Sequence, residues 1–426
     1  MQDPIPTVIT RIRPIAVFMF FMGSLFYIYD FALQVSPSVM TQELMQDFSA
    51  NATVLGVIAA SFYISYTFMQ LPAGLILDRF GARLTLTIAC ITCAFGALLF
   101  GLAPDITILT TGRVLMGLGG AFAFTSSLYL ILRWLPTSSY AFFVGITQIL
   151  CGIGSLGGSS VLAILISNVG WRHSMILLSL IGFVIMLLSW LCIRNQPTDI
   201  YFPEKNDPPL LDNLIEILAR PQTWYIALYS IAIWAPMIGF SALWGVPFLK
   251  LACHLSNVSA ANAVALTWVG AALASPTVGW LSEKLQQRNI LLSMSALLGL
   301  IALLILIFIP NLPLLLIYML LFFVGVSAGG QSLIFAVVKD INRREACSTA
   351  NGFNNMAVVG GGLLFQPLIG KMLDVAWCGV SISGERFYDL HGYHVALSTL
   401  PICSLIALII AVFFIKETFC TSTYQT

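Results

Sequence analysis

The sequence predicts an all-α integral membrane protein with twelve membrane-spanning helices in two pseudo-symmetric bundles of six. Of its 426 residues, 59% are hydrophobic and only 9% are charged, whereas soluble proteins carry roughly 25% charged residues. The mean hydropathy is +0.94. Apolar runs of the length that crosses a bilayer as a helix, about 20 residues, recur along the whole chain. They cover residues 14–38, 52–76, 83–102, 107–131, 140–167, 173–194, 223–249, 259–281, 289–309, 313–338, 347–373 and 393–415.

The positive charges between these runs predict the orientation of the chain. Of the 19 Lys and Arg residues, fourteen lie in loops on one side of the membrane, four (Arg172, Lys250, Lys371 and Arg386) lie on the other, and Arg113 lies within a span. The fourteen are Arg11, Arg13, Arg79, Arg83, Arg133, Arg194, Lys205, Arg220, Lys284, Arg288, Lys339, Arg343, Arg344 and Lys416. Because positively charged loops stay in the cytoplasm, we predict a multi-pass plasma membrane protein, in a bacterium an inner membrane protein, with both termini cytoplasmic.

A polar segment divides the runs six and six. It is rich in Pro, Asp and Asn and predicts a first bundle over 1–194, a cytoplasmic linker over 195–222 and a second bundle over 223–426. The bundles match each other at nearly one offset: 13–14 with 220–221 and 144–158 with 351–365 at 207 residues, and 74–83 with 279–288 at 205. We therefore predict a duplicated six-helix unit, a transporter architecture that places the solute between the halves.

Two motifs agree with this architecture. The loop between the second and third runs reads Gly74-x-x-x-Asp78-Arg79-x-Gly81-x-Arg83, with a weaker copy in Glu283, Lys284 and Arg288, and the fourth run carries Arg113-x-x-x-Gly117-x-Gly119-Gly120-Ala121. Both resemble motifs of the major facilitator superfamily. The resemblance implies two rocking halves and a cytoplasmic latch, formed by the loop residues, that holds helix ends together in one state and releases them in the other. The alternative role of the loop is topological anchoring by positive charge.

Two ionisable residues, Asp30 and Arg113, lie well inside the spans. Charges in the membrane are costly and usually functional. At 1.5 Å per residue both lie about 10 Å below the outer boundary, so they can meet, and Tyr27 and Gln34 share a helix face with Asp30. Relatives use an acid on the first helix and this arginine for proton coupling, so the resemblance implies that Asp30 takes and releases a proton beside Arg113. Two alternatives are a structural pair and contact between Arg113 and a solute anion.

The second half offers neutral groups instead of charges. At an offset of 207 residues the counterparts of Asp30 and Arg113 are Met237 and Leu320. Indole and amide groups can stack on and hydrogen bond to a ligand, although packing is the alternative role for each residue. The candidate solute-binding residues are Tyr27, Gln34, Arg113, Gln148, Trp234, Trp244, Asn262, Gln331, Asn354 and Asn355. Asn354 and Asn355 are favoured, because they align with the region of Gln148 in the repeat.

Two motifs that would indicate ATP-driven transport or metal chemistry are missing from the sequence. The chain has no G-x-x-x-x-G-K-[ST] phosphate loop and no H-E-x-x-H metal motif. We predict no enzymatic activity, no cofactor, no metal and no nucleic-acid partner. The predicted partners are a small-molecule solute, protons and the lipid bilayer, for a chain that acts as a monomer. Cys253 and Cys378 both fall in outer loops and can pair, but their spacing does not decide it.

The predicted function is proton-coupled uptake of a small polar organic solute by alternating access. An organic acid or anion, a sugar acid, an amino acid and a peptide all agree with the sequence. The alternative is proton-driven efflux of drugs, metabolites or siderophores. Many drug/proton antiporters of the resembling family carry Gly-Pro in helix 5, where this chain has Ser155-Leu156, and this difference favours uptake.

Overall fold

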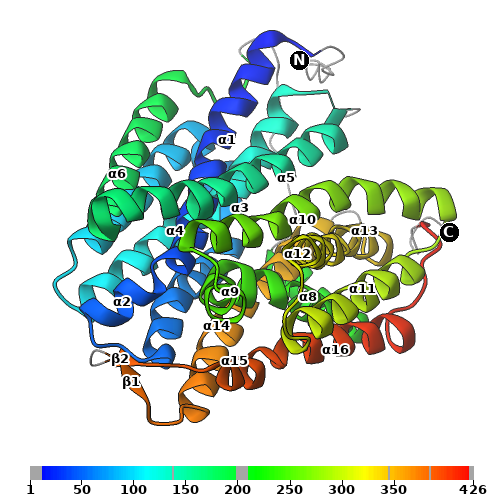
Figure 1. Ribbon diagram of the computed structural model, residues 1–426. Coiled ribbons are helices and arrows are strands. Elements are labelled where there is room, and N and C mark those ends of the chain that lie inside the picture. The colour runs from blue at the N-terminus through cyan, green and yellow to red at the C-terminus, as the bar shows by residue number, and fades with distance from the viewer. Residues whose placement is uncertain (1–11, 137–138, 198–209, 344–345, 383–384, 422–426) are drawn as a thin grey trace, which may run out of the picture.

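The computed structural model describes residues 12–136, 139–197, 210–343, 346–382 and 385–421, nearly all of them helical (Figure 1). The first half contains α1 (Pro14–Val35), η1 (Ser36–Val39), α2 (Thr41–Asp47), α3 (Ala52–Leu102), α4 (Ile106–Trp134), α5 (Tyr140–Leu156), η3 (Gly157–Val161) and α6 (Leu162–Cys192). The second contains α8 (Pro221–Ala235), η4 (Pro236–Trp244), α9 (Gly245–Cys253), α10 (Asn257–Leu285), α11 (Asn289–Phe308), α12 (Leu314–Ala328), α13 (Gln331–Ile341), α14 (Cys347–Val375), β1 (Ser381–Ile382), β2 (Glu385–Arg386), α15 (Leu390–Leu397) and α16 (Thr399–Phe413).

The predicted linker is partly helical. Between the halves lies α7 (Leu210–Leu218), whose Glu216 forms ion pairs with Arg220 and Arg343. Residues 198–209 of the linker, together with Arg11, Lys205 and Arg344 of the predicted charge bias, lie outside the described residues. The domain boundaries therefore stay a prediction.

The chain crosses the membrane twelve times. Ten helices among the described residues are long and apolar enough to span it, and two of these, Ala52–Leu102 and Phe142–Cys192, have 51 residues each. Each long helix turns back at a glycine with a positive φ, Gly81 (φ 76, ψ 168) or Gly170 (φ 78, ψ 163). This backbone region is open essentially only to glycine. Each long helix therefore forms two crossings, so the ten helices cross twelve times, which confirms the predicted number.

Local sequence signals set several helix starts. Asn51 and Asp105 accept hydrogen bonds from the third helical N–H of α3 and α4 (2.9 Å each), as N-caps do. Pro14 and Pro221 occupy the first positions of α1 and α8, where the missing N–H costs nothing. The Arg-Pro pair that the repeat shares is thus the same structural element twice, a helix start.

Glycines bring the helices of each half into backbone contact. A Cβ atom at Gly117 of α4 would overlap the carbonyl oxygen of Phe62 in α3, and one at Gly325 of α12 would overlap that of Thr267 in α10. These are the corresponding helix pairs of the two halves. Small residues allow such close approach in membrane bundles, so the duplicated sequence produces a duplicated packing.

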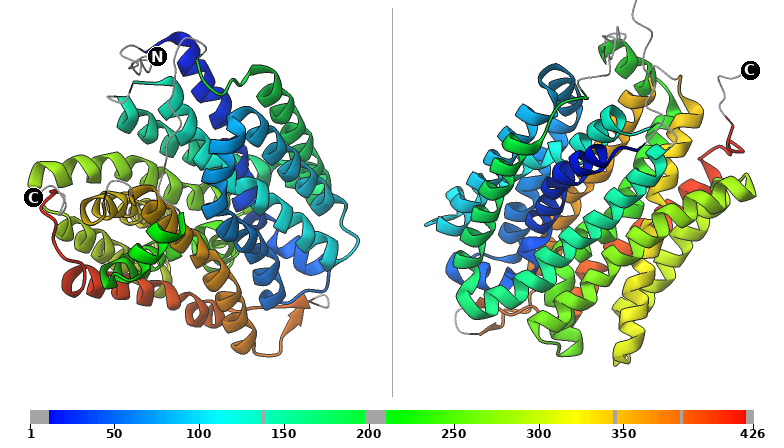
Figure 2. Two further views of the ribbon diagram at one scale, coloured as in Figure 1. Left: turned by 180° about the vertical axis from the view of Figure 1, so that it is seen from behind. Right: turned by 90° about the horizontal axis from the view of Figure 1, so that it is seen from above.

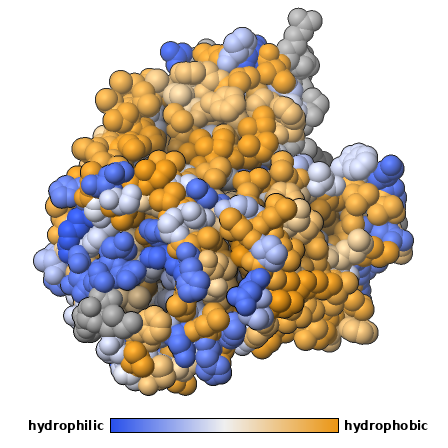
Figure 3. Space-filling model, viewed as in Figure 1, coloured by the Kyte–Doolittle hydropathy of each residue, from blue (hydrophilic) through white to orange (hydrophobic). Residues whose placement is uncertain are grey.

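The outer surface of the bundle is apolar where lipid would surround it. Polar side chains gather toward the ends of the molecule in Figure 3, with hydrophobic side chains between them. Large apolar side chains are exposed, among them Phe68 (74% exposed) and Phe413 (76%). Both ends of the described chain lie opposite the β1–β2 hairpin (Figures 1 and 2). We call the side of the termini the inner side and the side of the hairpin the outer side.

The two halves meet most closely on the outer side, along α3 and α14. A Cβ atom at Gly56 would lie only 2.5 Å from the carbonyl oxygen of Gln366, and one at Gly370 would overlap Ala52. Toward the inner side the same helices meet through side chains instead of backbones, because the nearest atom to a Cβ at Gly352 is a side-chain carbon of Leu71 3.7 Å away. The structure is therefore closed on its outer side.

The turn glycines provide a test of the fold. We expect Gly170→Ala to lower the melting temperature of the purified protein, because its backbone region costs other residues about 1–3 kcal/mol. Gly81→Ala should lower it further, since its Cβ would also overlap the side chain of Asn195. Gly279→Ala is the control, because Gly279 is helical with no atom within 4 Å of its Cβ position. Equal melting temperatures for all three variants would contradict the assigned turns.

Candidate functional site

Asp30 lies in the last third of α1, toward its outer end, and is completely buried. Neither of its carboxyl oxygens has a hydrogen-bond partner. Its Oδ1 packs against Gly120 of α4, where an added Cβ would overlap it. A buried carboxyl group without partners is exceptional in proteins, so Asp30 is a candidate for function and not only for packing.

Arg113 of α4 is also completely buried; both of its terminal nitrogens are bonded, while its Nε has no partner. Its Nη1 donates to the carbonyl oxygen of Leu33 in α1 (2.9 Å) and its Nη2 to that of Ala59 in α3 (3.3 Å). The guanidinium carbon also lies 4.9 Å from the ring centroid of Phe62, a cation–π distance. Arg113 thus joins three helices of the first half.

The predicted Asp30–Arg113 pair lies close together without a direct ion pair. The two groups are near enough to interact electrostatically, yet the carboxyl oxygens of Asp30 accept no hydrogen bond from the guanidinium. In this closed-outside state the two terminal nitrogens of Arg113 donate to the carbonyls of Leu33 and Ala59 instead, so the role of the pair stays a prediction.

Tyrosines and amides surround Asp30 on α1 and α3. Tyr27 and Gln34 of α1 are buried, as the shared helix face predicts. Tyr63 of α3 lies close to Gln34, and its hydroxyl has no hydrogen-bond partner. Tyr66, one turn further, lies beside Gln70. This aromatic and amide cluster provides neutral donors and acceptors next to the candidate proton site.

The cluster reaches into the second half through α14. Asn355 donates to the side-chain oxygen of Gln70 (2.9 Å), which links the two halves directly. Gln366 lies near Tyr63, donates to the carbonyl of Ile238 in the π-helical segment η4 (3.1 Å), and keeps a side-chain oxygen without a partner. Residues from both halves therefore face each other around Asp30.

Several other predicted solute-binding residues have, or pack against residues that have, buried polar atoms without a hydrogen-bond partner. Asn354 accepts from Ser230 (2.7 Å) while its amide nitrogen has no partner. Gln331 is buried with both side-chain polar atoms unpaired. Trp234 packs against Trp268, whose indole N–H also has no partner (ring centroids 6.4 Å).

The remaining candidates lie in different surroundings. Trp244 is fully buried and its indole N–H already donates to the carbonyl of Gln366 (3.1 Å). Asn262 is exposed and Gln148 is half-buried. Trp244 thus contacts the cluster through the backbone of Gln366, whereas no described hydrogen bond joins the side chain of Asn262 or Gln148 to it.

Sequence reasoning missed Tyr63, Tyr66, Gln70 and Gln366. A signal was present for three of them, because positions 63, 66 and 70 follow steps of three and four and share one face of a helix. Gln366 had no such signal, since its importance depends on contact between the halves.

The described contacts of Arg83 and Asp78, two predicted latch residues, are with the first half and the start of the linker. Arg83 donates through its backbone N–H to Asn195 (2.9 Å) and through Nε to the carbonyl of Trp190 (2.8 Å), and its guanidinium lies over the Trp190 ring. Asp78 lies close to Tyr129 of α4. The described contacts of Arg83 thus fasten the turn at Gly81 to the end of α6.

The weaker copy of the latch binds the end of the chain. Arg288 forms a buried ion pair with Asp340 (3.3 Å), while Lys284 lies over the ring of Trp280. Glu417 accepts hydrogen bonds from the backbone N–H groups of Arg288 and Asn289 at the start of α11 (2.7–3.0 Å). Partial burial raises the pKa of Glu417. These hydrogen bonds, together with those from the N–H groups of Thr418 and Phe419, lower it by more, so the pKa lies below its ordinary value.

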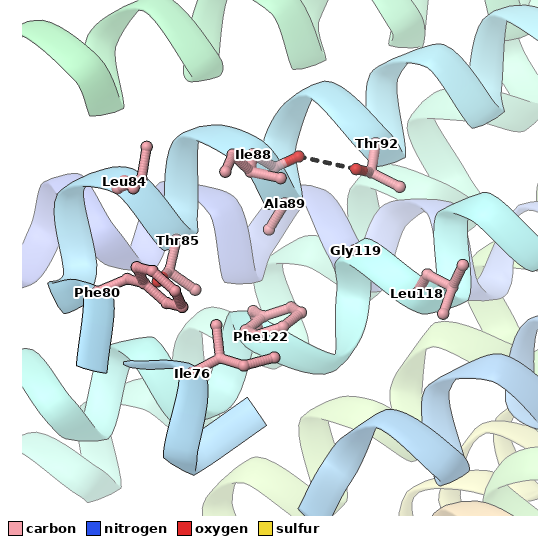
Figure 4. A pocket seen from close by; sticks show the side chains of 10 residues that line it. All are labelled: Ile76, Phe80, Leu84, Thr85, Ile88, Ala89, Thr92, Leu118, Gly119 and Phe122. Carbon is pink, nitrogen blue, oxygen red and sulfur yellow. Dashed lines mark hydrogen bonds between the residues drawn. The ribbon is translucent and has the colours of Figure 1, made fainter. Parts of the chain in front are cut away.

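A surface groove between α3 and α4 is apolar and separate from the cluster (Figure 4). It is lined by Ile76, Phe80, Leu84, Thr85, Ile88, Ala89, Thr92, Leu118, Gly119 and Phe122. It has two hydroxyl groups: that of Thr92 is bonded to the carbonyl of Ile88 (2.9 Å), and that of Thr85 is buried without a partner. A lining of this kind suits lipid chains and not a polar solute. Elsewhere, Cys253 and Cys378 are free thiols, so the structure does not contain that pairing.

Comparison with known proteins decides the family. The model of the Major Facilitator Superfamily matches residues 16–366 and 237–419. The chain belongs to this superfamily. The match covers both halves, in agreement with the duplicated fold, and the chain is a multi-pass membrane protein.

The matches to curated relatives have low sequence identity, and most of them cover only part of either chain. A hexuronate transporter of Bacillus subtilis is 25% identical over 44% of this chain, and a probable L-galactonate transporter of Escherichia coli is 23% identical over 58%. The matches span 43% and 54% of these relatives. A probable hexose phosphate transport protein of Chlamydia trachomatis is 21% identical over 92% of this chain and 89% of its own.

Solved structures share the fold. A bacterial homologue of the human lysosomal transporter Spinster, in an inward-facing and unoccupied conformation, matches with a TM-score of 0.76 at 17% identity, over 95% of this chain and 97% of its own. The fucose:proton symporter of Escherichia coli matches with a TM-score of 0.62 at 19% identity, over 94% of this chain and 99% of its own.

Glu417 provides a test of the contacts at the start of α11. Because folding lowers its pKa, the carboxylate stabilises the fold above its ordinary pKa of 4.5 and loses this contribution as the pH falls below it. We expect Glu417→Gln to lower the melting temperature at pH 7, with a loss of up to about 1 kcal/mol as for other caps, and the difference from wild type to shrink toward pH 4. Glu283→Gln, an exposed carboxylate in the same region, is the control. A constant difference across this pH range would contradict the assignment.

Proposed function

We propose that the protein takes up a small hydroxylated organic acid together with protons, by alternating access of its two halves. The observation that carries the proton part is the complete burial of Asp30 without a hydrogen bond to either oxygen. The solute part rests on the tyrosine and amide cluster around it and on the transported classes of the relatives.

In the closed-outside state we infer that Asp30 carries a proton. An unpaired carboxylate in the membrane core is costly, and burying the neutral acid costs much less. The proton would arrive from the outer side in the opposite state and leave to the inner side, when water reaches the carboxyl group or when Arg113 comes into direct contact with it. A direct contact would stabilise the charged form, so movement of α1 against α4 would change the proton affinity of Asp30.

We assign Arg113 an indirect role. Both of its terminal nitrogens are bonded to carbonyls, and the side chain is fully buried. It therefore holds α1 and α3 beside Asp30 and supplies positive potential there. The contact with a solute anion that the sequence left open is not part of this proposal.

The proposed solute class follows from the neutral groups and the relatives together. Hydroxyl and amide groups such as those of Tyr63, Gln70 and Asn355 suit a solute with several hydroxyl groups. The relatives named as transporters of hexuronate and L-galactonate carry sugar acids. A sugar acid is therefore the first class to test.

The proton role predicts a specific defect for Asp30→Asn. In proteoliposomes with an inward proton gradient, we expect concentrative uptake of labelled D-glucuronate to be lost, while exchange of labelled for unlabelled D-glucuronate continues. Asp105→Asn is the matched control, because asparagine also caps a helix and Asp105 caps α4 on the outer side. Uptake by Asp30→Asn at the wild-type level would refute the proton role.

The solute role predicts a specific defect for Tyr63→Phe. This substitution removes a buried, unpaired hydroxyl and keeps the ring, so we expect a KM for D-glucuronate raised about tenfold, the effect of about 1.4 kcal/mol. Tyr229→Phe is the control, since its hydroxyl donates to the carbonyl of Leu292 (3.0 Å) within the second half. If D-glucuronate is not transported, the same comparison is made with L-galactonate. An unchanged KM would remove Tyr63 from the site.

A further inference from the structure

The outer contact between the halves ends in a polar cluster around Asp374, at the end of α14. Its Oδ2 accepts hydrogen bonds from the backbone N–H (2.8 Å) and the hydroxyl (2.5 Å) of Thr53, at the start of α3 in the other half. Its Oδ1 accepts from the hydroxyl of Tyr388 (2.5 Å) and from Arg386 (3.1 Å). The hydroxyl of Tyr388 also accepts from the N–H of Ala52 (3.0 Å).

This arrangement stabilises a helix start across the interface. The first N–H groups of a helix have no partner within it and form the positive end of its dipole. Asp374 and Tyr388, both from the second half, bind two of these groups in α3. Hydrogen bonds to an ionised carboxylate are stronger than neutral ones. The cluster therefore joins the halves more firmly than packing alone.

Two glycines prepare this contact on the same faces of the two helices. Gly370 lies one turn before Asp374 and against Ala52, while Gly56 lies one turn after Ala52 and against Gln366. Because neither glycine has a side chain, the backbones touch, and the carboxylate of Asp374 can reach the helix start.

The halves have a second line of contact, or seam, on the outer side. It lies between α10 and the continuous helix formed by α5, η3 and the part of α6 before Gly170, and it lacks these groups. With the repeat offset of 207 residues for α14 and 205 for α3, the counterparts of Asp374 and Thr53 are Ser167 and Val258, and those of Gly370 and Gly56 are Ala163 and Ala261. The hydroxyl of Ser167 bonds to Ile164 in its own helix (2.8 Å). The polar cluster is thus an addition to one seam and not a product of the duplicated scaffold.

We propose that Asp374, Thr53 and Tyr388 form a lock that holds the outer side closed and breaks when the halves separate there. This proposal rests on the alternating access proposed above. Tyr388 and Arg386 belong to the same half as Asp374, so they remain bonded to it when α3 moves away. The carboxylate then keeps partners in both states, and the freed N–H groups of α3 gain water. The lock can therefore open without leaving a bare buried charge.

The lock is tested by measuring the distance between the outer ends of the halves. Nitroxide labels on Gln46→Cys and His391→Cys, both exposed positions on opposite halves, report it by pulsed electron resonance in a cysteine-free background in nanodiscs. We expect one short distance without substitution, and for Asp374→Asn a ratio of open to closed molecules raised at least tenfold, because two charge-assisted bonds to Thr53 are weakened. Thr53→Val, which loses only the hydroxyl bond, should raise the ratio less.

The controls separate this lock from the transport proposal. Asp389→Asn should leave the distances unchanged, since Asp389 caps α15 within its own half. No solute or proton gradient is needed, so failure of D-glucuronate transport would not affect the result. Should Asp374→Asn not fold, Thr53→Val carries the test from the other half. Unchanged distances in every folded variant at Asp374 or Thr53 would overturn the proposal.

Discussion

The central constraint in this structure is a cation, Arg113, buried completely among membrane helices. Such a charge persists only when partners replace the water it has lost. Here the partners are carbonyls of α1 and α3 and the face of Phe62. Satisfying one guanidinium thus fixes the relative positions of three helices, and the place of Asp30 follows from it.

The rest of the second motif serves the same constraint. Gly117 lets α4 touch the backbone of α3, and Gly120 leaves room for the carboxyl group of Asp30. A side chain at either position would push α4 away from its neighbours and break the bonds of Arg113. The arginine and glycines are therefore one structural unit, in which small residues permit the close approach that the charge requires.

The two halves share a scaffold and differ in chemistry. Asp30 and Arg113, the buried charges within the predicted spans, lie in the first half, while the spans of the second half supply amides and indoles, several with polar atoms that lack partners, such as Gln331 and Trp268. Unpaired buried polar groups are costly, so a polar solute that binds them would recover that cost. The outer seam is asymmetric as well, because only the contact between α3 and α14 carries Asp374 and its partners.

The sequence by itself determined what depends on local or periodic signals. The twelve spans follow from apolar length, the turn at Gly81 lies within the predicted loop, and the repeat predicted the paired helix starts at Pro14 and Pro221. The burial of Asp30 and Arg113 followed from their place within apolar runs. The family was also recognisable, since its motifs are contiguous.

Only the tertiary structure decided which groups meet. Equal depth in the membrane suggested that Asp30 and Arg113 pair, but the rotation and tilt of the helices give Arg113 to backbone carbonyls, which no sequence pattern marks as available. Gln366, Tyr388 and Asp374 likewise gain their roles through contacts between residues hundreds of positions apart. Helix periodicity specifies the face on which a side chain lies, whereas the partner on that face depends on how the two halves are packed in one conformational state.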